Sequence, residues 1–101
     1  MIYKTEKGYI RYDYDDIEDA VVIEDLEAYE KRKGVGSELV RMAIDYAVEI
    51  GKNVSICARP LDDSISLEDL ITFYENLGFD QEETGDEFFQ NMIYVNYGGG
   101  Q

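Results

Sequence analysis

The sequence predicts a mixed α/β domain with a central, mostly antiparallel sheet and two main helices. Large apolar and polar side chains alternate in residues 9–14 and again in residues 54–58, which is the pattern of strands with one buried face. Apolar residues recur at three- and four-residue steps in residues 37–50 and 67–77, which is typical of amphipathic helices. Between residues 20 and 58 a strand, a helix and a strand follow one another, which predicts a right-handed crossover joining parallel strands.

The first third of the chain is predicted to form an antiparallel meander. Residues 1–4 form a short strand in this interpretation, and residues 9–14 form the second strand. The acidic segment Asp15–Asp19 supplies a polar turn, after which Ala20–Glu27 returns as the third strand. Neighbouring strands joined by such short turns pair antiparallel.

Two helices follow, each with a recognisable end. The first covers residues 37–50 and stops at Gly51, a residue that readily takes the left-handed conformation that ends helices. The second opens at Ser66, where Asp69 three residues later resembles a capping box, and ends at Gly78.

A strand made of alternating apolar residues lies between the two helices, and further extended segments follow the second. Val54, Ile56 and Ala58 alternate in the strand before Pro60, and Cys57 beside them is interpreted as a buried structural thiol. An extended segment then follows from residue 79, a turn at residues 84–86 and a last strand over residues 88–97. With no linker long enough to divide it, the chain is expected to be a single domain over residues 1–97 with a flexible glycine tail at 98–101.

The charge balance limits the function classes. The chain has 23 Asp and Glu against 9 Lys and Arg, a net charge of −14. Such a surface disfavours direct binding to nucleic acid, because phosphate contacts need a basic face. It favours a strongly basic protein partner, or else mimicry of nucleic acid.

Three absences narrow the chemistry further. The chain has no His, the usual general base and commonest metal ligand, so no metal site is expected. Its single Cys cannot form an internal disulfide, which suits a reducing cytoplasm. No apolar run reaches the length of a membrane span, and no signal pattern opens the chain, so a cytoplasmic protein without membrane contact is expected.

One basic segment interrupts the acidic sequence. Lys31, Arg32 and Lys33 precede Gly34-Val35-Gly36-Ser37, at the point where a strand gives way to a helix. Two glycines in this spacing let the backbone turn tightly and point its N–H groups outward at the helix N-terminus, where unpaired amides and the helix dipole favour an anion. With three cations upstream, a pyrophosphate is the natural candidate.

These residues resemble the acyl-CoA loop of the GCN5-related N-acetyltransferase (GNAT) superfamily. Lys31-x-x-Gly34-x-Gly36 matches the loop usually written Arg/Gln-x-x-Gly-x-Gly/Ala, and the run from Phe73 to Phe79 looks like the second family motif, a helix closing on Leu-Gly-Phe. The chain resembles still more closely the small phage-encoded type V-A anti-CRISPR acetyltransferases, through Gly8-Tyr9-Ile10, the loop at 31–37 and residues 62–74. That family uses acetyl-CoA to modify a lysine with which a CRISPR effector nuclease reads its adjacent DNA motif.

The resemblance implies a compact GNAT fold with a splayed sheet, here without the usual N-terminal strand and helices. An acceptor site left open in this way suits a bulky protein substrate.

The resemblance also implies a role for individual residues. Tyr74 matches a tyrosine that often acts as general acid toward the departing thiolate, and backbone groups of Leu26 and Glu27 would pair with the pantetheine arm. The pyrophosphate would be held by Lys31, Arg32, Lys33, Gly34, Val35, Gly36 and Ser37.

Two questions stay open at this level. Without a His, the base that deprotonates the acceptor amine is a carboxylate or a water relay; Glu24 and Glu27 flank the expected cleft, and neither matches a family position. The favoured function is acetyl transfer to a lysine of a basic, nucleic-acid-binding protein. The alternatives are an acidic nucleic-acid mimic on a degenerate GNAT fold, and a GNAT enzyme acting on a small amine. A homodimer is also left open.

Overall fold

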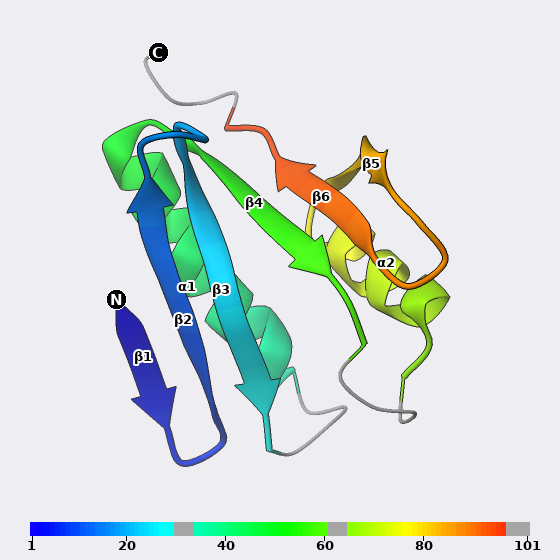
Figure 1. Ribbon diagram of the computed structural model, residues 1–101. Coiled ribbons are helices and arrows are strands. Elements are labelled where there is room, and N and C mark those ends of the chain that lie inside the picture. Colours follow the sequence, from blue (N-terminus) through cyan, green and yellow to red (C-terminus); the bar gives the residue numbers. More distant parts are fainter. Residues whose placement is uncertain (30–33, 61–64, 97–101) are drawn as a thin grey trace.

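A computed structural model of the chain describes residues 1–29, 34–60 and 65–96. Within these ranges the chain forms one six-stranded sheet and two helices (Figure 1). The elements are β1 Ile2–Thr5, β2 Gly8–Asp15, β3 Ala20–Ala28, α1 Val35–Ile50, β4 Asn53–Ala58, α2 Leu67–Asn76, β5 Asp80–Gly85 and β6 Gln90–Tyr94. The predicted α/β fold class is confirmed.

The sheet has the order β1-β2-β3-β4-β6-β5, and β3 and β4 form its one parallel pair. The meander of β1, β2 and β3 is antiparallel, as predicted. Helix α1 makes the crossover between β3 and β4, so the predicted strand-helix-strand unit is confirmed as well.

The helix ends follow from local chemistry. Helix α1 begins at Val35, two residues earlier than predicted, because the carbonyl of Gly34 already accepts a hydrogen bond from the N–H of Glu38 at 3.0 Å. It ends at Gly51, which has a left-handed φ of 71°, as expected. At the start of α2 the hydroxyl of Ser66 accepts a hydrogen bond from the N–H of Asp69 at 3.1 Å, which is the predicted cap.

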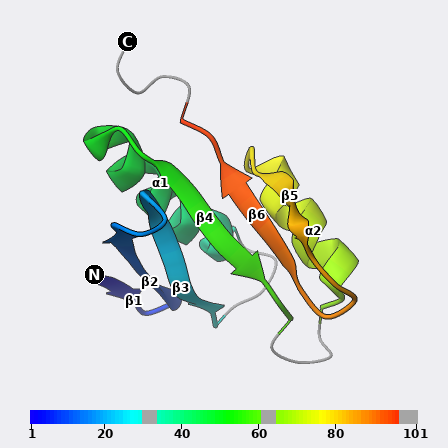
Figure 2. The same cartoon turned by 45° about the horizontal axis from the view of Figure 1, so that its top comes forward.

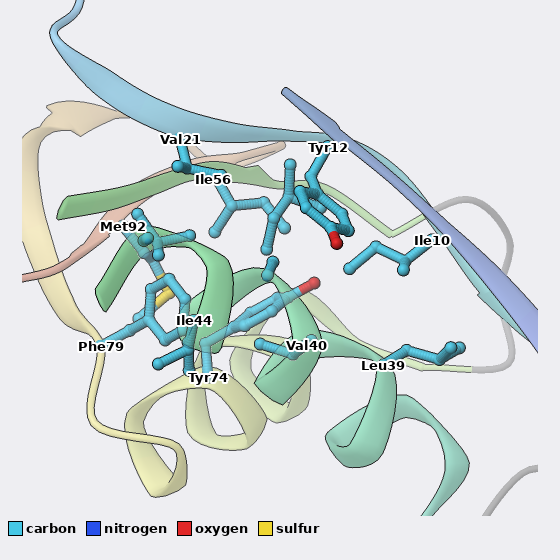
Figure 3. Close-up of a cluster of buried hydrophobic side chains, with 14 of the residues drawn as sticks. Ile10, Tyr12, Val21, Leu39, Val40, Ile44, Ile56, Tyr74, Phe79 and Met92 are labelled. Carbon is cyan, nitrogen blue, oxygen red and sulfur yellow. The ribbon is translucent and has the colours of Figure 1, made fainter. Parts of the chain in front are cut away.

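The core lies on one side of the sheet. Figure 3 shows side chains from α1 and α2 meeting beneath the strands. Ile10, Val21 and Val54 from the sheet and Val40 from α1 are fully buried, each with 0 % of its surface exposed. Burying one such side chain stabilises the fold by about 1.5–3 kcal/mol.

The prediction that Cys57 is a buried thiol is wrong. Val54, Ile56 and Ala58 point into the core, and the alternation of the strand turns Cys57 to the opposite, exposed face. Periodicity alone could not tell that this face of β4 has no helix packed against it in the described part of the chain.

The last strand is shorter than predicted, and the turn before it comes later, because β5 continues to Gly85 through part of the predicted turn at residues 84–86. Strand β6 begins at Gln90, because residues 86–89 form a turn in which the N–H of Asp86 donates to the carbonyl of Phe89 at 2.8 Å. The predicted tail at 98–101 lies outside the described residues. The two described helices do not include one that is long and apolar enough to cross a membrane.

Candidate active site

The central feature of the site is a place where β3 and β4 part. The two strands pair from Ala20 with Asn53 to Ile23 with Ile56 and no further. Beyond this point β3 stays paired with β2, and β4 stays paired with β6. Figure 1 shows the two strands diverging toward the N-terminal end of α1. The described sheet is therefore splayed, as the resemblance implied.

The last part of β3 presents a free backbone edge to this opening. The N–H of Tyr29 donates to the carbonyl of Lys7 at 2.7 Å, so the backbone groups of Tyr29 face β2. Because these groups alternate along a strand, those of Glu27 also face β2, whereas those of Leu26 and Ala28 face the opening. No strand of the described chain pairs with that edge. An extended molecule with amide groups could form hydrogen bonds with this edge, as a neighbouring strand would.

The N-terminus of α1 lies at the wide end of the opening. Gly34 has a left-handed φ of 75°, and no side chain caps the helix. The N–H groups of Val35, Gly36 and Ser37 belong to the first turn, where intrahelical acceptors are missing. Together with the helix dipole they form a site suited to a negatively charged group. Lys31, Arg32 and Lys33, the cations predicted to assist, lie outside the described residues.

The two sequence motifs meet at the helix start. A Cβ atom placed on Gly36 would lie 3.3 Å from Cζ of Phe73 in α2, a distance tighter than most carbon contacts. Gly36 thus allows the backbone of α1 to approach α2 closely. Sequence reasoning placed both motifs at one site, but it did not identify Phe73 as the side chain that joins them. The position of Phe73 within the second motif is the sequence feature that could have indicated this role.

Tyr74 is part of the core. Only 3 % of its surface is exposed, and its ring stacks edge-on against Phe73 and Phe79, with centroids 5.0 Å and 5.4 Å away. Figure 3 shows the hydroxyl pointing away from Phe79. Burial raises the pKa of Tyr74 well above the ordinary range of a tyrosine, so the phenol keeps its proton at all physiological pH values.

Glu24 lies at an irregularity in β3. The register with β2 passes from Arg11 opposite Asp25 to Tyr12 opposite Ile23, so Glu24 is an extra residue with no partner across the strand pair. Its carboxylate forms an ion pair with Arg11, with Oε2 at 3.2 Å from Nε. The bulge directly follows Ile23, the last residue of β3 that pairs with β4, so Glu24 stands where the two strands part.

A second carboxylate beside the bulge is also engaged. The hydroxyl of Tyr9 donates a hydrogen bond to Oδ2 of Asp25 at 2.9 Å, and this bond raises the pKa of Tyr9. Nothing in the sequence pattern signalled either the bulge or this hydrogen bond. Among the described residues, no group of three or more His, Cys, Asp or Glu side chains could hold a metal ion.

A cavity of about 350 Å³ lies beside the site. The β1–β2 hairpin covers one side and α1 the other, and Val35 belongs to both the cavity wall and the helix start. The remaining lining residues are Tyr3, Thr5, Glu6, Lys7, Glu38, Leu39 and Met42. The cavity lies toward β1, whereas Leu26 and Ala28 face the opening toward β4, so the two spaces flank the start of α1 on different sides.

Comparison with known proteins gives a relative over nearly the whole chain. No protein-family model matches the sequence, and no curated protein sequence does. Among solved structures, the crystal structure of the anti-CRISPR protein AcrVA5 matches with a TM-score of 0.83 and 38% sequence identity, covering 94% of this chain and 97% of that one.

A more distant likeness concerns the fold alone. The crystal structure of PH1933 from Pyrococcus horikoshii matches with a TM-score of 0.69 and 17% identity, covering 91% of this chain and 61% of that one. Identity at the level found with AcrVA5, over a shared six-stranded sheet and two helices, reflects common descent. The chain therefore belongs to the family of the anti-CRISPR protein AcrVA5.

Proposed function

We propose that this protein is an acetyl-CoA-dependent N-acetyltransferase of the GNAT type with an anti-CRISPR role. Its acceptor is a lysine side chain on a basic, nucleic-acid-binding protein such as the effector nuclease of a CRISPR system. The likeness to AcrVA5 supports the anti-CRISPR role. Acetylation removes the positive charge of a lysine, and with it a contact to phosphate or to a base.

The observation that carries this proposal is the free edge of β3 beside the uncapped start of α1. Backbone groups of Leu26 and Ala28 face the opening, and the amides of Val35, Gly36 and Ser37 lie at its wide end. Acetyl-CoA carries a pantetheine arm with two amides and a pyrophosphate. The strand edge suits the amides, and the helix start suits the phosphates.

The acyl transfer needs three things from the protein. The acceptor amine must be deprotonated, the thioester carbonyl polarised and the departing sulfur stabilised. In this proposal the N–H of Leu26 polarises the carbonyl. The lysine nitrogen forms a bond to the carbonyl carbon while the carbon–sulfur bond breaks. The amine proton passes to water or to Glu24, whose carboxylate would first leave its ion pair with Arg11.

Tyr74 donates a hydrogen bond to the departing sulfur in this scheme. Its raised pKa argues against complete proton transfer, because a thiol has a pKa of about 8.5 and its thiolate is too weak a base to deprotonate such a phenol. The thiolate takes its proton from solvent. The hydroxyl is buried in the free protein, so the bound cofactor must approach it through the opening between β3 and β4.

The proposal is tested by supplying acetyl-CoA, the purified protein and a panel of basic proteins that includes a type V-A effector nuclease. We expect free CoA to accumulate, and mass spectrometry to show an added acetyl group on a lysine of the acceptor. Parallel reactions with spermidine and with lysine peptides separate a protein acceptor from a small amine. Release of CoA at the background rate with every acceptor would exclude catalysis.

Gly34→Glu separates the enzyme from a nucleic-acid mimic. A carboxylate at the helix start would repel the pyrophosphate, so an enzyme loses its inhibitory effect on the nuclease. A mimic would keep its effect with this substitution, and it would act in a one-to-one ratio without acetyl-CoA.

A further inference from the structure

The turn between β5 and β6 carries a large apolar side chain in solvent. Phe88 has 68 % of its surface exposed, the largest fraction of any described phenylalanine. Aromatic side chains are enriched at protein–protein interfaces, where a few of them supply most of the binding energy. Single exposed apolar residues are common on protein surfaces, so the case for Phe88 depends on how it is held, where it lies and what surrounds it.

The turn is held in place by side-chain hydrogen bonds. One carboxylate oxygen of Asp86 accepts from the N–H groups of Phe88 and Phe89, at 2.7 Å and 3.2 Å. The side-chain amide of Gln90 donates to the carbonyls of Glu82 and Thr84, at 2.6 Å and 3.0 Å, across the irregular part of the β5–β6 pair. A residue presented by an ordered turn loses little conformational entropy on binding.

The position of the turn links it to the candidate active site. Gln90, at the start of β6, pairs with Ala58 at the end of β4. This is the end of the sheet at which β3 and β4 have parted, and Figures 1 and 2 show the β5–β6 turn at that end. A protein whose lysine enters the opening from this end of the sheet would therefore approach the turn that carries Phe88.

The charges around Phe88 indicate the chemistry of the partner. Residues 80–90 contain five carboxylates and no Lys or Arg, namely Asp80, Glu82, Glu83, Asp86 and Glu87. Asp86 holds the turn through its carboxylate, and the other four side chains are exposed. A basic surface with an apolar recess is complementary to an aromatic residue in such surroundings.

We propose that the β5–β6 turn is the docking element that recognises the acceptor protein, with Phe88 entering an apolar recess among its lysines and arginines. The identity of the partner rests on the proposed function, whereas the docking surface itself can be tested by binding alone.

The test compares Phe88→Ala with Ile17→Ala. Ile17 is 93 % exposed and is also flanked by carboxylates, but it lies in the β2–β3 turn, next to the pairing of Ala20 with Asn53 at the opposite end of the sheet. We expect Phe88→Ala to raise the KM for a type V-A effector nuclease at least about tenfold, the loss typical of an interface anchor. The kcat, the transfer rate to a lysine peptide and the affinity for acetyl-CoA stay at wild-type values in Phe88→Ala. Ile17→Ala leaves all of these quantities and the KM for the nuclease at wild-type values.

The dissociation constant for the nuclease, measured by calorimetry without acetyl-CoA, keeps the two proposals apart. If the wild-type protein binds the nuclease and transfers no acetyl group, the proposed function fails while a tenfold weaker binding of Phe88→Ala still supports the docking element. An unchanged dissociation constant for Phe88→Ala, or an equal loss for Ile17→Ala, overturns it. So does a change in the sedimentation coefficient of the isolated protein caused by Phe88→Ala, because Phe88 would then hold a second copy of the chain.

Discussion

Tyr74 shows how one residue can be both structural and reactive. Its ring lies between Phe73 and Phe79 in the core, and only 3 % of its surface is exposed. The same burial raises the pKa of the phenol, so the hydroxyl group stays protonated in the folded protein at neutral pH and can donate a hydrogen bond. In the proposed reaction this neutral hydroxyl serves the departing sulfur without ever ionising.

The raised pKa of Tyr74 predicts a loss of stability in alkali. A group whose pKa is higher in the folded state contributes stability that is complete below its unfolded pKa, here 10.0, and is lost as the pH rises above it. The free energy of unfolding of the wild-type protein should therefore fall relative to Tyr74→Phe by about 1.4 kcal/mol per pH unit above pH 10.

Urea denaturation of the two proteins at several pH values between 8 and about 11.5 measures this difference. The pKa values of Tyr9, Tyr12 and Tyr14 are also raised, but those tyrosines are present in both proteins and their effects cancel. A constant difference between the two proteins across this range would contradict a buried, neutral Tyr74.

At the scale of elements, the ends of α1 are set by two glycines with nearly the same conformation. Gly34 has a φ of 75° and Gly51 a φ of 71°, and a Cβ on either would meet no atom within 4 Å. The strain of a side chain at such a φ is therefore the main effect of substitution, at about 1 kcal/mol. The two positions differ in their surroundings, because Gly34 lies at the proposed pyrophosphate site and Gly51 lies at the far end of the helix.

This matched pair separates stability from cofactor binding. Gly34→Ala and Gly51→Ala should each lower the free energy of unfolding by about 1 kcal/mol. Gly34→Ala should in addition weaken the binding of acetyl-CoA several-fold, because the strained residue tilts the amides of Val35 and Gly36. Thermal denaturation and calorimetric titration with acetyl-CoA measure the two effects. Equal acetyl-CoA affinities for both variants would argue against a pyrophosphate at this helix start.

At the scale of the whole molecule, the charged side chains of the described residues lie at the surface. No charged side chain is buried among the described residues, so their carboxylates, which belong to a chain with a net charge of −14, lie where a partner can reach them. Ion pairs among the described residues, such as Lys52 with Asp19 at 2.8 Å, involve groups that are partly or fully exposed. Pairs of this kind contribute little to stability, and the excess of negative charge acts mainly at long range.

This charge predicts association that depends strongly on salt. The rate constant for association with a basic acceptor protein should fall at least about tenfold between roughly 50 mM and 300 mM NaCl, because the Debye length shortens over this range. The dissociation rate constant should change much less. Surface plasmon resonance at several salt concentrations measures both, and a glycerol series at matched viscosity serves as the control. An association rate that is independent of salt would rule out electrostatic steering.

Most of the local structure was determined by the sequence itself. The period of the apolar residues in 37–50, the Ser66–Asp69 cap and the left-handed Gly51 are all local interactions, because they join residues within one turn of the chain. The alternation in β4 likewise predicted Val54, Ile56 and Ala58 as core residues. The positions of the glycines after β3 also identified where α1 would begin, to within two residues.

Tertiary structure decided what the opening between the strands looks like and which groups surround it. The bulge at Glu24, the free edge at Leu26 and the contact between Gly36 and Phe73 depend on residues far apart in the chain. The exposure of Cys57 depends in the same way on which face of the sheet the helices cover. A periodic pattern reports that a side chain is apolar or polar, whereas burial and strand pairing depend on partners that only the folded chain brings into contact.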